Sequence, residues 1–267
     1  MKQIEAVIFD WAGTTVDHGS LAPVKAVTEI FSRQGIRISD AEARRDMGLY
    51  KKDHIRRILA MPRVANEWIE AAGKSPEESD VERLFAEFLP LQMEILEAHA
   101  EVIAGVVEIS EKLRSRGIKL GSTTGYTRPM LSLLAMQAAS QGYRPDMALC
   151  PDDTAGGRPH PWMCLQIALE FRLSSMAAAV KVGDTPSDIE EGRNAGMWTV
   201  GVSATGNEVG LSAAGLTALP EAERSHRIAR ACVKLKAAGA HYVIESVAQV
   251  EPVIEEIGGR RARGERP

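Results

Sequence analysis

The sequence predicts an α/β fold: a doubly wound, Rossmann-like parallel sheet with an inserted α-helical cap domain. Three observations predict it. A short apolar run, Ala6–Phe9, ends at Asp10, as is typical of a strand buried on both faces of a parallel sheet. About eighty residues of helical spacing follow, far more than a strand–helix–strand crossover needs. From Gly105 onward, strand and helix patterns alternate regularly, which indicates a doubly wound sheet.

The helical block begins with residues 23–34, an amphipathic stretch that ends at Gly35. Ser39 and Glu42 form a capping-box-like start for the next helix. The further helices of the block are expected at 42–47, 52–60, 62–72 and 76–97. We therefore assign residues 20–98 to a cap domain, and residues 1–19 and 99–267 to the α/β core domain.

The core elements are separated by loops rich in Gly, Pro and Asp. Gly117 ends one helix, and Pro186 begins another at a position where its missing N–H is harmless. Strands are expected at 118–122, 147–150, 178–182, 198–202 and 241–244, and helices at 106–116, 128–141, 160–171, 186–195, 221–238 and 247–257. We expect the basic, glycine-rich tail 258–267 to be frayed.

Composition excludes several classes of partner. The chain has 32 Lys and Arg against 36 Asp and Glu, a formal charge of −4, so it carries no basic field for nucleic acid. We see no membrane-spanning run and no secretory leader, and expect no membrane partner. Cys150, Cys164 and Cys232 are odd in number and widely spaced, which favours reduced, buried thiols and a cytoplasmic location.

Chemistry-bearing residues follow the predicted strands, at the edge where open α/β sheets bind ligands. Asp10 follows the first strand, and Gly13, Thr14 and Thr15 add small donors suited to an oxyanion. A carboxylate beside an anion-binding loop needs a cation between them. We expect Mg²⁺, which prefers carboxylate and carbonyl oxygens.

Three later loops complete a candidate phosphoryl-transfer site. Asp10 is the candidate nucleophile, forming an aspartyl-phosphate, and Asp184 would hold the metal with Asp188 supporting it from the next turn. Asp188 could instead only stabilise the start of its helix, and Arg158 could be a surface charge. Thr124 and Gly125 would bind phosphoryl oxygens, while Arg158 would neutralise charge on the transferring group.

These motifs resemble the haloacid dehalogenase superfamily of phosphotransferases. Its first motif matches residues 10–14, its second matches 122–125, and its last matches 183–188. Most phosphatases of that superfamily carry a second Asp two residues after the nucleophile, where this chain has Ala12. A methyl group cannot protonate a leaving alkoxide. The third motif usually supplies Lys, whereas the loop here offers Arg158.

The cap contains a candidate replacement. Lys51 follows the break at Gly48, and His54 lies three residues later, on the same face of a helix. A partly desolvated lysine can attack an aldehyde and form a Schiff base. A protonated imine β to a C–P bond is an electron sink, so the carbon leaves as an enamine and no oxygen needs protonating, which would account for Ala12. The alternative is a solvated cap charge.

Longer stretches resemble the phosphonoacetaldehyde hydrolase (phosphonatase) family: residues 10–17, 47–54, 121–128, 157–163 and 182–188. The resemblance implies hydrolysis of phosphonoacetaldehyde to acetaldehyde and phosphate. It implies Asp10 as nucleophile, Lys51 as the Schiff-base residue, and Mg²⁺ held by Asp10, the Ala12 carbonyl and Asp184. It further implies that Met47, Gly48 and His54 lie near the substrate, with His54 a candidate proton shuttle.

The same resemblance implies a homodimer joined through the caps and a small-molecule phosphonate as substrate. Some relatives carry Cys where this chain has Ser20, so no role of that thiol is carried over. The nearest alternative function is a phosphomonoester phosphatase or phosphomutase of the same superfamily. A non-catalytic phospho-acceptor domain fits the large helical insertion less well, and no Gly-x-Gly-x-x-Gly follows a strand to indicate a dinucleotide site.

Overall fold

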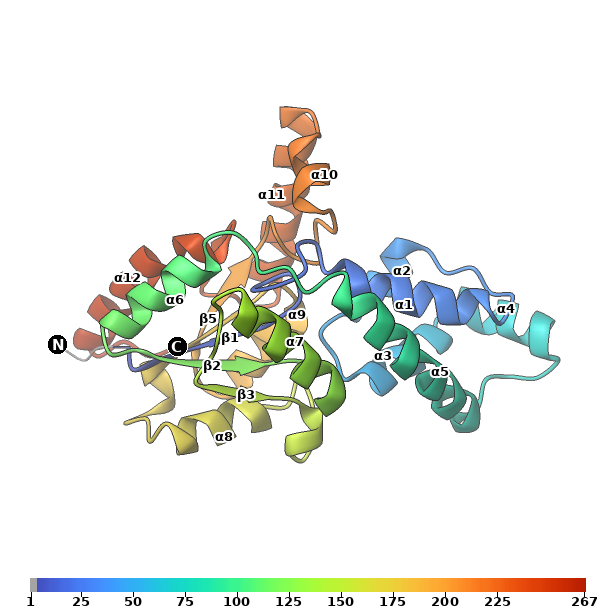
Figure 1. Ribbon diagram of the computed structural model, residues 1–267, viewed down its shortest axis with the longest axis horizontal. Coiled ribbons are helices and arrows are strands. Elements are labelled where there is room, and N and C mark those ends of the chain that lie inside the picture. Colours follow the sequence, from blue (N-terminus) through green and yellow to red (C-terminus); the bar gives the residue numbers. More distant parts are fainter. Residues whose placement is uncertain (1–3) are drawn as a thin grey trace.

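The computed structural model describes residues 4–267, and in them one six-stranded parallel sheet forms the centre of the core (Figure 1). The strand order is β3-β2-β1-β4-β5-β6. Successive strands add on one side of β1 up to β3 and on the other side from β4, so β1 and β4 flank the topological switch point where such sheets bind ligands. The strands are β1 (Ala6–Phe9), β2 (Lys119–Thr123), β3 (Met147–Leu149), β4 (Ala179–Gly183), β5 (Trp198–Val202) and β6 (Tyr242–Ile244).

Strand β1 is apolar at every position because both of its faces are covered. Val7 and Phe9 belong to the large core cluster that also contains residues of the cap, whereas Ala6 and Ile8 pack in a second cluster with Met163. All four residues of β1 are buried. The strand therefore holds Asp10, the next residue, rigidly at the sheet edge.

Helices cover the sheet and extend beyond it. In Figure 1, α6 and α12 lie together on one side, α8 lies on the other, and α10 and α11 project away from the sheet. The core helices are α6 (Val106–Ser115), α7 (Arg128–Ser140), α8 (Trp162–Glu170), α9 (Pro186–Asn194), α10 (Ala213–Thr217), α11 (Glu221–Ala237) and α12 (Val250–Ala262).

Helices α1 to α5 form a separate bundle beside the sheet, inserted between β1 and β2 (Figure 1). The predicted capping box is present, since Ser39 Oγ accepts from Glu42 N at 3.3 Å and Glu42 Oε2 accepts from Ser39 N at 2.8 Å. The bundle contains α1 (Leu21–Ser32), α2 (Asp40–Arg44), α3 (Lys51–Leu59), α4 (Pro62–Ala72) and α5 (Glu78–Glu97).

The predicted fold class is confirmed, including the parallel sheet and the helical insertion. The predicted fraying of 258–267 is wrong for residues 258–262, because α12 continues to Ala262 and buries Arg261. The short helix α10 was not predicted, since it has only five residues and a Ser212 cap as its local signal. No helix among residues 4–267 is both long enough and apolar enough to cross a membrane.

Candidate active site

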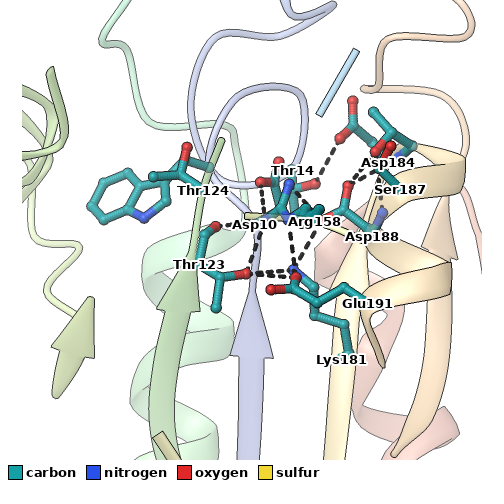
Figure 2. A network of polar contacts seen from close by, with 12 residues as sticks. Asp10, Thr14, Thr123, Thr124, Arg158, Lys181, Asp184, Ser187, Asp188 and Glu191 are labelled. Atoms are coloured by element: carbon teal, nitrogen blue, oxygen red, sulfur yellow. Dashed lines mark hydrogen bonds and ion pairs between the residues drawn. The ribbon is translucent and has the colours of Figure 1, made fainter. Parts of the chain in front are cut away.

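Asp10 lies at the carboxyl end of β1, at the switch point of the sheet (Figure 2). Its backbone N–H donates to Val182 O at 2.9 Å, so the residue extends the pairing with β4 by one step. The loop then folds back, because Thr15 Oγ1 donates to Asp10 O at 2.9 Å. The carboxylate is nearly buried, at 5% exposure. It is therefore held rigidly in a site that excludes most water.

Three buried carboxylates meet here. Asp10, Asp184 and Asp188 each offer an oxygen that lies within 4.8 Å of the others. Burial, followed by the neighbouring carboxylates, raises the pKa of Asp10 and raises the pKa of Asp184 well above its ordinary value. A divalent cation among these oxygens would relieve the repulsion. The set is all oxygen, which suits a hard ion such as Mg²⁺, Mn²⁺ or Ca²⁺.

Arg158 holds two of these carboxylates together. Its guanidinium lies 2.7 Å from Asp10 Oδ1, 3.0 Å from Asp188 Oδ1 and 2.9 Å from Glu191 Oε2. Figure 2 shows it between Asp10 and Asp188. Although burial opposes ionisation of Asp188, Arg158 and Lys181 keep its pKa below the ordinary value. Since Arg158 is only 4% exposed, it is not a surface charge.

Lys181 is a second buried cation, and the sequence analysis did not predict it as part of the site. Its side chain rises from the middle of β4, with Nζ 2.8 Å from Asp188 Oδ1 and 3.4 Å from Glu191 Oε2. It also donates to Thr123 Oγ1 at 3.0 Å. A lysine inside an apolar, five-residue strand needs buried partners to offset its desolvation. A charged residue in such a strand is the feature of the sequence that could have indicated a buried ion pair. Glu191 gave no such signal.

The residues expected to bind phosphoryl oxygens lie beside Asp10. Thr124 is nearly buried, and its Oγ1 accepts from Tyr126 N at 3.2 Å, which shapes the loop after β2. Thr14 Oγ1 donates to Asp184 Oδ1 at 3.4 Å, so this hydroxyl is directed at the candidate metal ligand.

The cap residues are buried against the core. Lys51 Nζ, at 3% residue exposure, lies 3.5 Å from Met47 Sδ and 5.3 Å from the centre of the Tyr126 ring. Burial lowers the pKa of Lys51 to about 8. Burial and the nearby Lys51 lower the pKa of His54 to about 3, so its imidazole is neutral at physiological pH. Lys51 is therefore not a solvated charge.

Lys51 and Asp10 line one narrow cavity, of about 20 Å³. That is room for roughly one water molecule. Asp188 and His54 do not line it and lie behind other residues. The other predicted residues that line it are Ala12, Met47, Gly48, Thr124, Gly125, Arg158 and Asp184, and Ser20 and Tyr126 join them.

Comparisons with known proteins agree with this geometry. The family model of haloacid dehalogenase-like hydrolases matches residues 4–196, and a second hydrolase-like model of that superfamily matches 155–249. A phosphonoacetaldehyde hydrolase from Bacillus cereus is 48% identical over 255 residues, which cover 96% of this chain and 97% of that protein. This chain belongs to the phosphonoacetaldehyde hydrolase family.

A solved structure supports the same family. The crystal structure of a phosphonoacetaldehyde hydrolase-like protein from Oleispira antarctica has a TM-score of 0.97 at 46% identity, and the match covers 99% of this chain and 96% of that chain. A β-phosphoglucomutase from Clostridium difficile, with a TM-score of 0.69 at 18% identity, shares only the fold. The match to the Oleispira antarctica structure thus includes the helical insertion as well as the sheet.

Two glycines allow the cap of this phosphonoacetaldehyde hydrolase family member to approach its core closely. A Cβ on Gly125 would lie 2.4 Å from Leu49 O and 2.6 Å from Gly48 O. A Cβ on Gly48, whose φ is +89°, would lie 2.5 Å from Thr185 Oγ1. Real Cβ atoms essentially never come within 3.0 Å of such an atom. Both glycines are therefore required for contact between the cap loop 47–50 and the core.

We predict that Gly125→Ala lowers kcat/KM by about 100-fold. The new methyl group would push the cap loop 47–50 away from the core, and a shift of about 1 Å in the position of reacting groups can cost that much. The measurement is steady-state kinetics of acetaldehyde release. Gly258→Ala is the matched control, since its Cβ would meet nothing within 4 Å. Equal kinetics for the two variants would contradict the steric argument.

We predict that Lys181→Met lowers the free energy of unfolding by about 3 to 5 kcal/mol, because it removes one of the two cations that pair with the buried Asp188 and Glu191 carboxylates. Urea unfolding followed by circular dichroism measures this. Lys112→Met serves as the control, since its ion pair with Glu251 is exposed and its loss should change stability by less than about 1 kcal/mol. Similar losses for both variants would count against a structural role for Lys181.

Proposed function

We propose that this chain hydrolyses the C–P bond of phosphonoacetaldehyde, giving acetaldehyde and phosphate through a lysine Schiff base and an aspartyl-phosphate. The observation that carries the proposal is the shared cavity of Lys51 and Asp10, which places an amine of lowered pKa beside a buried carboxylate. Membership of the phosphonoacetaldehyde hydrolase family supports the same substrate.

Lys51 prepares the substrate for cleavage. Its neutral amine attacks the aldehyde carbon, water leaves, and a protonated imine forms two bonds from phosphorus. Burial favours the neutral amine, because desolvation disfavours the ammonium form. Met47 Sδ, 3.5 Å from Nζ, helps to fix the amine in the cavity.

Asp10 then takes the phosphoryl group. Its carboxylate attacks phosphorus while the C–P bonding pair moves into the imine and forms an enamine, so the leaving group is carbon and needs no acid at Ala12. Arg158 orients Asp10 through the 2.7 Å contact with Oδ1. Thr124 and Gly125 line the same cavity and would contact the phosphoryl oxygens. Asp10, the Ala12 carbonyl and Asp184 would hold Mg²⁺, which neutralises charge on the phosphoryl group and the attacking carboxylate.

Two hydrolyses complete the cycle. Water attacks the aspartyl-phosphate and releases inorganic phosphate and Asp10. The enamine gains a proton on carbon, and the resulting imine is hydrolysed to acetaldehyde and Lys51. His54 is a candidate proton carrier for these steps, because it is neutral and lies one helical turn from Lys51.

Cap motion is part of the proposal. We assign residues 20–98 to the cap domain and 1–19 with 99–267 to the core. A cavity of about 20 Å³ is too small to admit the substrate, so the cap must open for entry and release. The first of the two connections includes Asp17 and Ser20, whose φ values are 52° and 50°.

We also propose that the protein is a homodimer joined through its caps, as the family resemblance implies. Light scattering after size-exclusion chromatography tests this. A mass equal to one 29.0 kDa chain at micromolar concentration would exclude the dimer.

A phosphomonoester phosphatase or phosphomutase of the same superfamily is the alternative function. It would have no use for a buried amine in the phosphoryl cavity, and it would need an acid where this chain has Ala12. Assays with phosphonoacetaldehyde and with a simple phosphomonoester, each with and without Mg²⁺, separate the two. Turnover of the ester alone would establish the alternative.

We predict that Lys51→Arg lowers acetaldehyde release by at least ~10³-fold, the scale seen when a covalent nucleophile is removed, because a guanidinium forms no imine. Borohydride with phosphonoacetaldehyde should label Lys51 in the wild type, as mapped by mass spectrometry, and nothing in the variant. Lys52→Arg is the matched control, since Lys52 pairs with Glu82 at 2.9 Å on the cap surface. A label at another lysine, or an active Lys51→Arg, would refute the Schiff base.

We predict that kcat/KM rises about tenfold per pH unit below pH 8 and levels off above it. The pKa of Lys51 is lowered to about 8, so the neutral amine is a minor form at pH 6 and the major form at pH 9. Initial rates at low substrate between pH 6 and 9.5 test this. A flat profile from pH 6 to 8 would show that amine deprotonation does not limit the reaction.

A further inference from the structure

The loop 203–210, which follows β5, contacts the nucleophile loop, the start of the cap connection and the candidate metal site. Thr205 Oγ1 donates to Gly13 O at 2.8 Å, next to the nucleophile loop. Gly19 N donates to Thr205 O at 2.7 Å, at the start of the cap connection. Asn207 N donates to Asp184 Oδ2 at 2.7 Å. The backbone of this loop therefore positions a carboxylate of the candidate metal site.

A cap side chain holds the same loop. Arg44, at the end of α2, donates to Asn207 Oδ1 at 3.1 Å, to Gly210 O at 3.2 Å and to Gly19 O at 2.8 Å. In return, Asn207 Nδ2 donates to Arg44 O at 3.2 Å. Asn207 is 1% exposed, and a Cβ on Gly210 would lie 2.7 Å from the Arg44 guanidinium. The guanidinium of Arg44 is therefore closely packed against Asn207 and Gly210 of this loop.

Arg44 has no use in the chemistry proposed above. It does not line the cavity, and no carboxylate of residues 4–267 forms an ion pair with it within 4.0 Å. Its hydrogen-bond acceptors are all neutral oxygens, mostly backbone carbonyls of the core. The carboxylates of Asp40, Asp17, Asp184 and Glu208 act on its charge without forming an ion pair. The contacts with Asn207 and Gly210 form only when α2 packs against the loop 203–210, so they depend on the position of the cap.

We propose that Arg44 and Asn207 are positioning residues that couple seating of the cap to the placement of Asp184. Arg44 holds the side chain of Asn207, and the backbone N–H of Asn207 holds Asp184 Oδ2. Coupling of this kind is reciprocal: a seated cap raises the affinity for Mg²⁺, and bound Mg²⁺ favours the seated cap. The inference rests on the metal site of the proposed function, and it extends that site to a residue of the cap.

The test measures Mg²⁺ binding without substrate. Isothermal titration calorimetry with MgCl₂ compares the wild type with Arg44→Met and with Arg45→Met. Arg45 is the matched control, because it is the adjacent, exposed arginine and its side chain forms no hydrogen bond or ion pair within residues 4–267. We expect Arg44→Met to weaken Mg²⁺ binding about 5- to 150-fold, the usual range of allosteric coupling, and Arg45→Met to change it less than twofold.

A second variant and a second readout guard against simple loss of folding. Asn207→Ala keeps the backbone N–H that holds Asp184 but loses the two side-chain hydrogen bonds with Arg44, so its Mg²⁺ affinity should also fall. Amide hydrogen exchange with and without Mg²⁺ should show protection of the cap loop 47–50 by Mg²⁺ in the wild type and in Arg45→Met, and not in the other two variants.

Three results would overturn the inference. Wild-type Mg²⁺ affinity in both Arg44→Met and Asn207→Ala would show that Arg44 only joins α2 to the loop 203–210 and does not affect the metal site. Equal loss in Arg45→Met would indicate a general charge effect. A wild type that binds no Mg²⁺ would remove the metal site itself, and the inference with it, while borohydride labelling of Lys51 would still test the proposed function separately.

Discussion

The structure depends on the burial of unbalanced charge at one edge of the sheet. Asp10, Asp184, Asp188 and Glu191 face two cations, Arg158 and Lys181, in a region with almost no exposure. The four carboxyl groups outnumber these two cations, and burial together with the neighbouring carboxylates raises the pKa of Asp10 and of Asp184; a divalent ion would favour their charged forms. Isolated buried charges are strongly unfavourable. The groups around this cluster must therefore offer it opposite charge or hydrogen bonds.

Part of this arrangement follows directly from local sequence. The apolar run before Asp10 predicts a buried strand, and strand endings in a parallel sheet predict that Asp10, Thr124 and Asp184 meet. The spacing from Asp184 to Asp188 places the second acid in the first turn of α9. Such features need only the identity of neighbouring residues and the rule that parallel strands share one edge.

Other features depend on contacts between distant segments, which no local pattern encodes. Lys181 and Glu191 could be placed in the site only once β4 and α9 were packed against Thr123 at the end of β2. Arg44 and Asn207 are separated by 163 residues in the chain. The order of 258–262 comes from packing of Ile254 and Ile257 in the core, which outweighs two helix-weakening glycines.

The burial of Lys51 also has a consequence for timing. An amine exposed to water has a pKa near 10.4 and is almost fully protonated at neutral pH, whereas in the occluded cavity the pKa is about 8. Closure of the cavity thus raises the neutral, reactive fraction of the amine by roughly two orders of magnitude at neutral pH, while the ammonium form still predominates below pH 8. Other aldehydes that reach Lys51 while it is exposed to water meet an unreactive ammonium ion. Selectivity against them therefore depends on when the amine loses its proton as well as on the shape of the cavity.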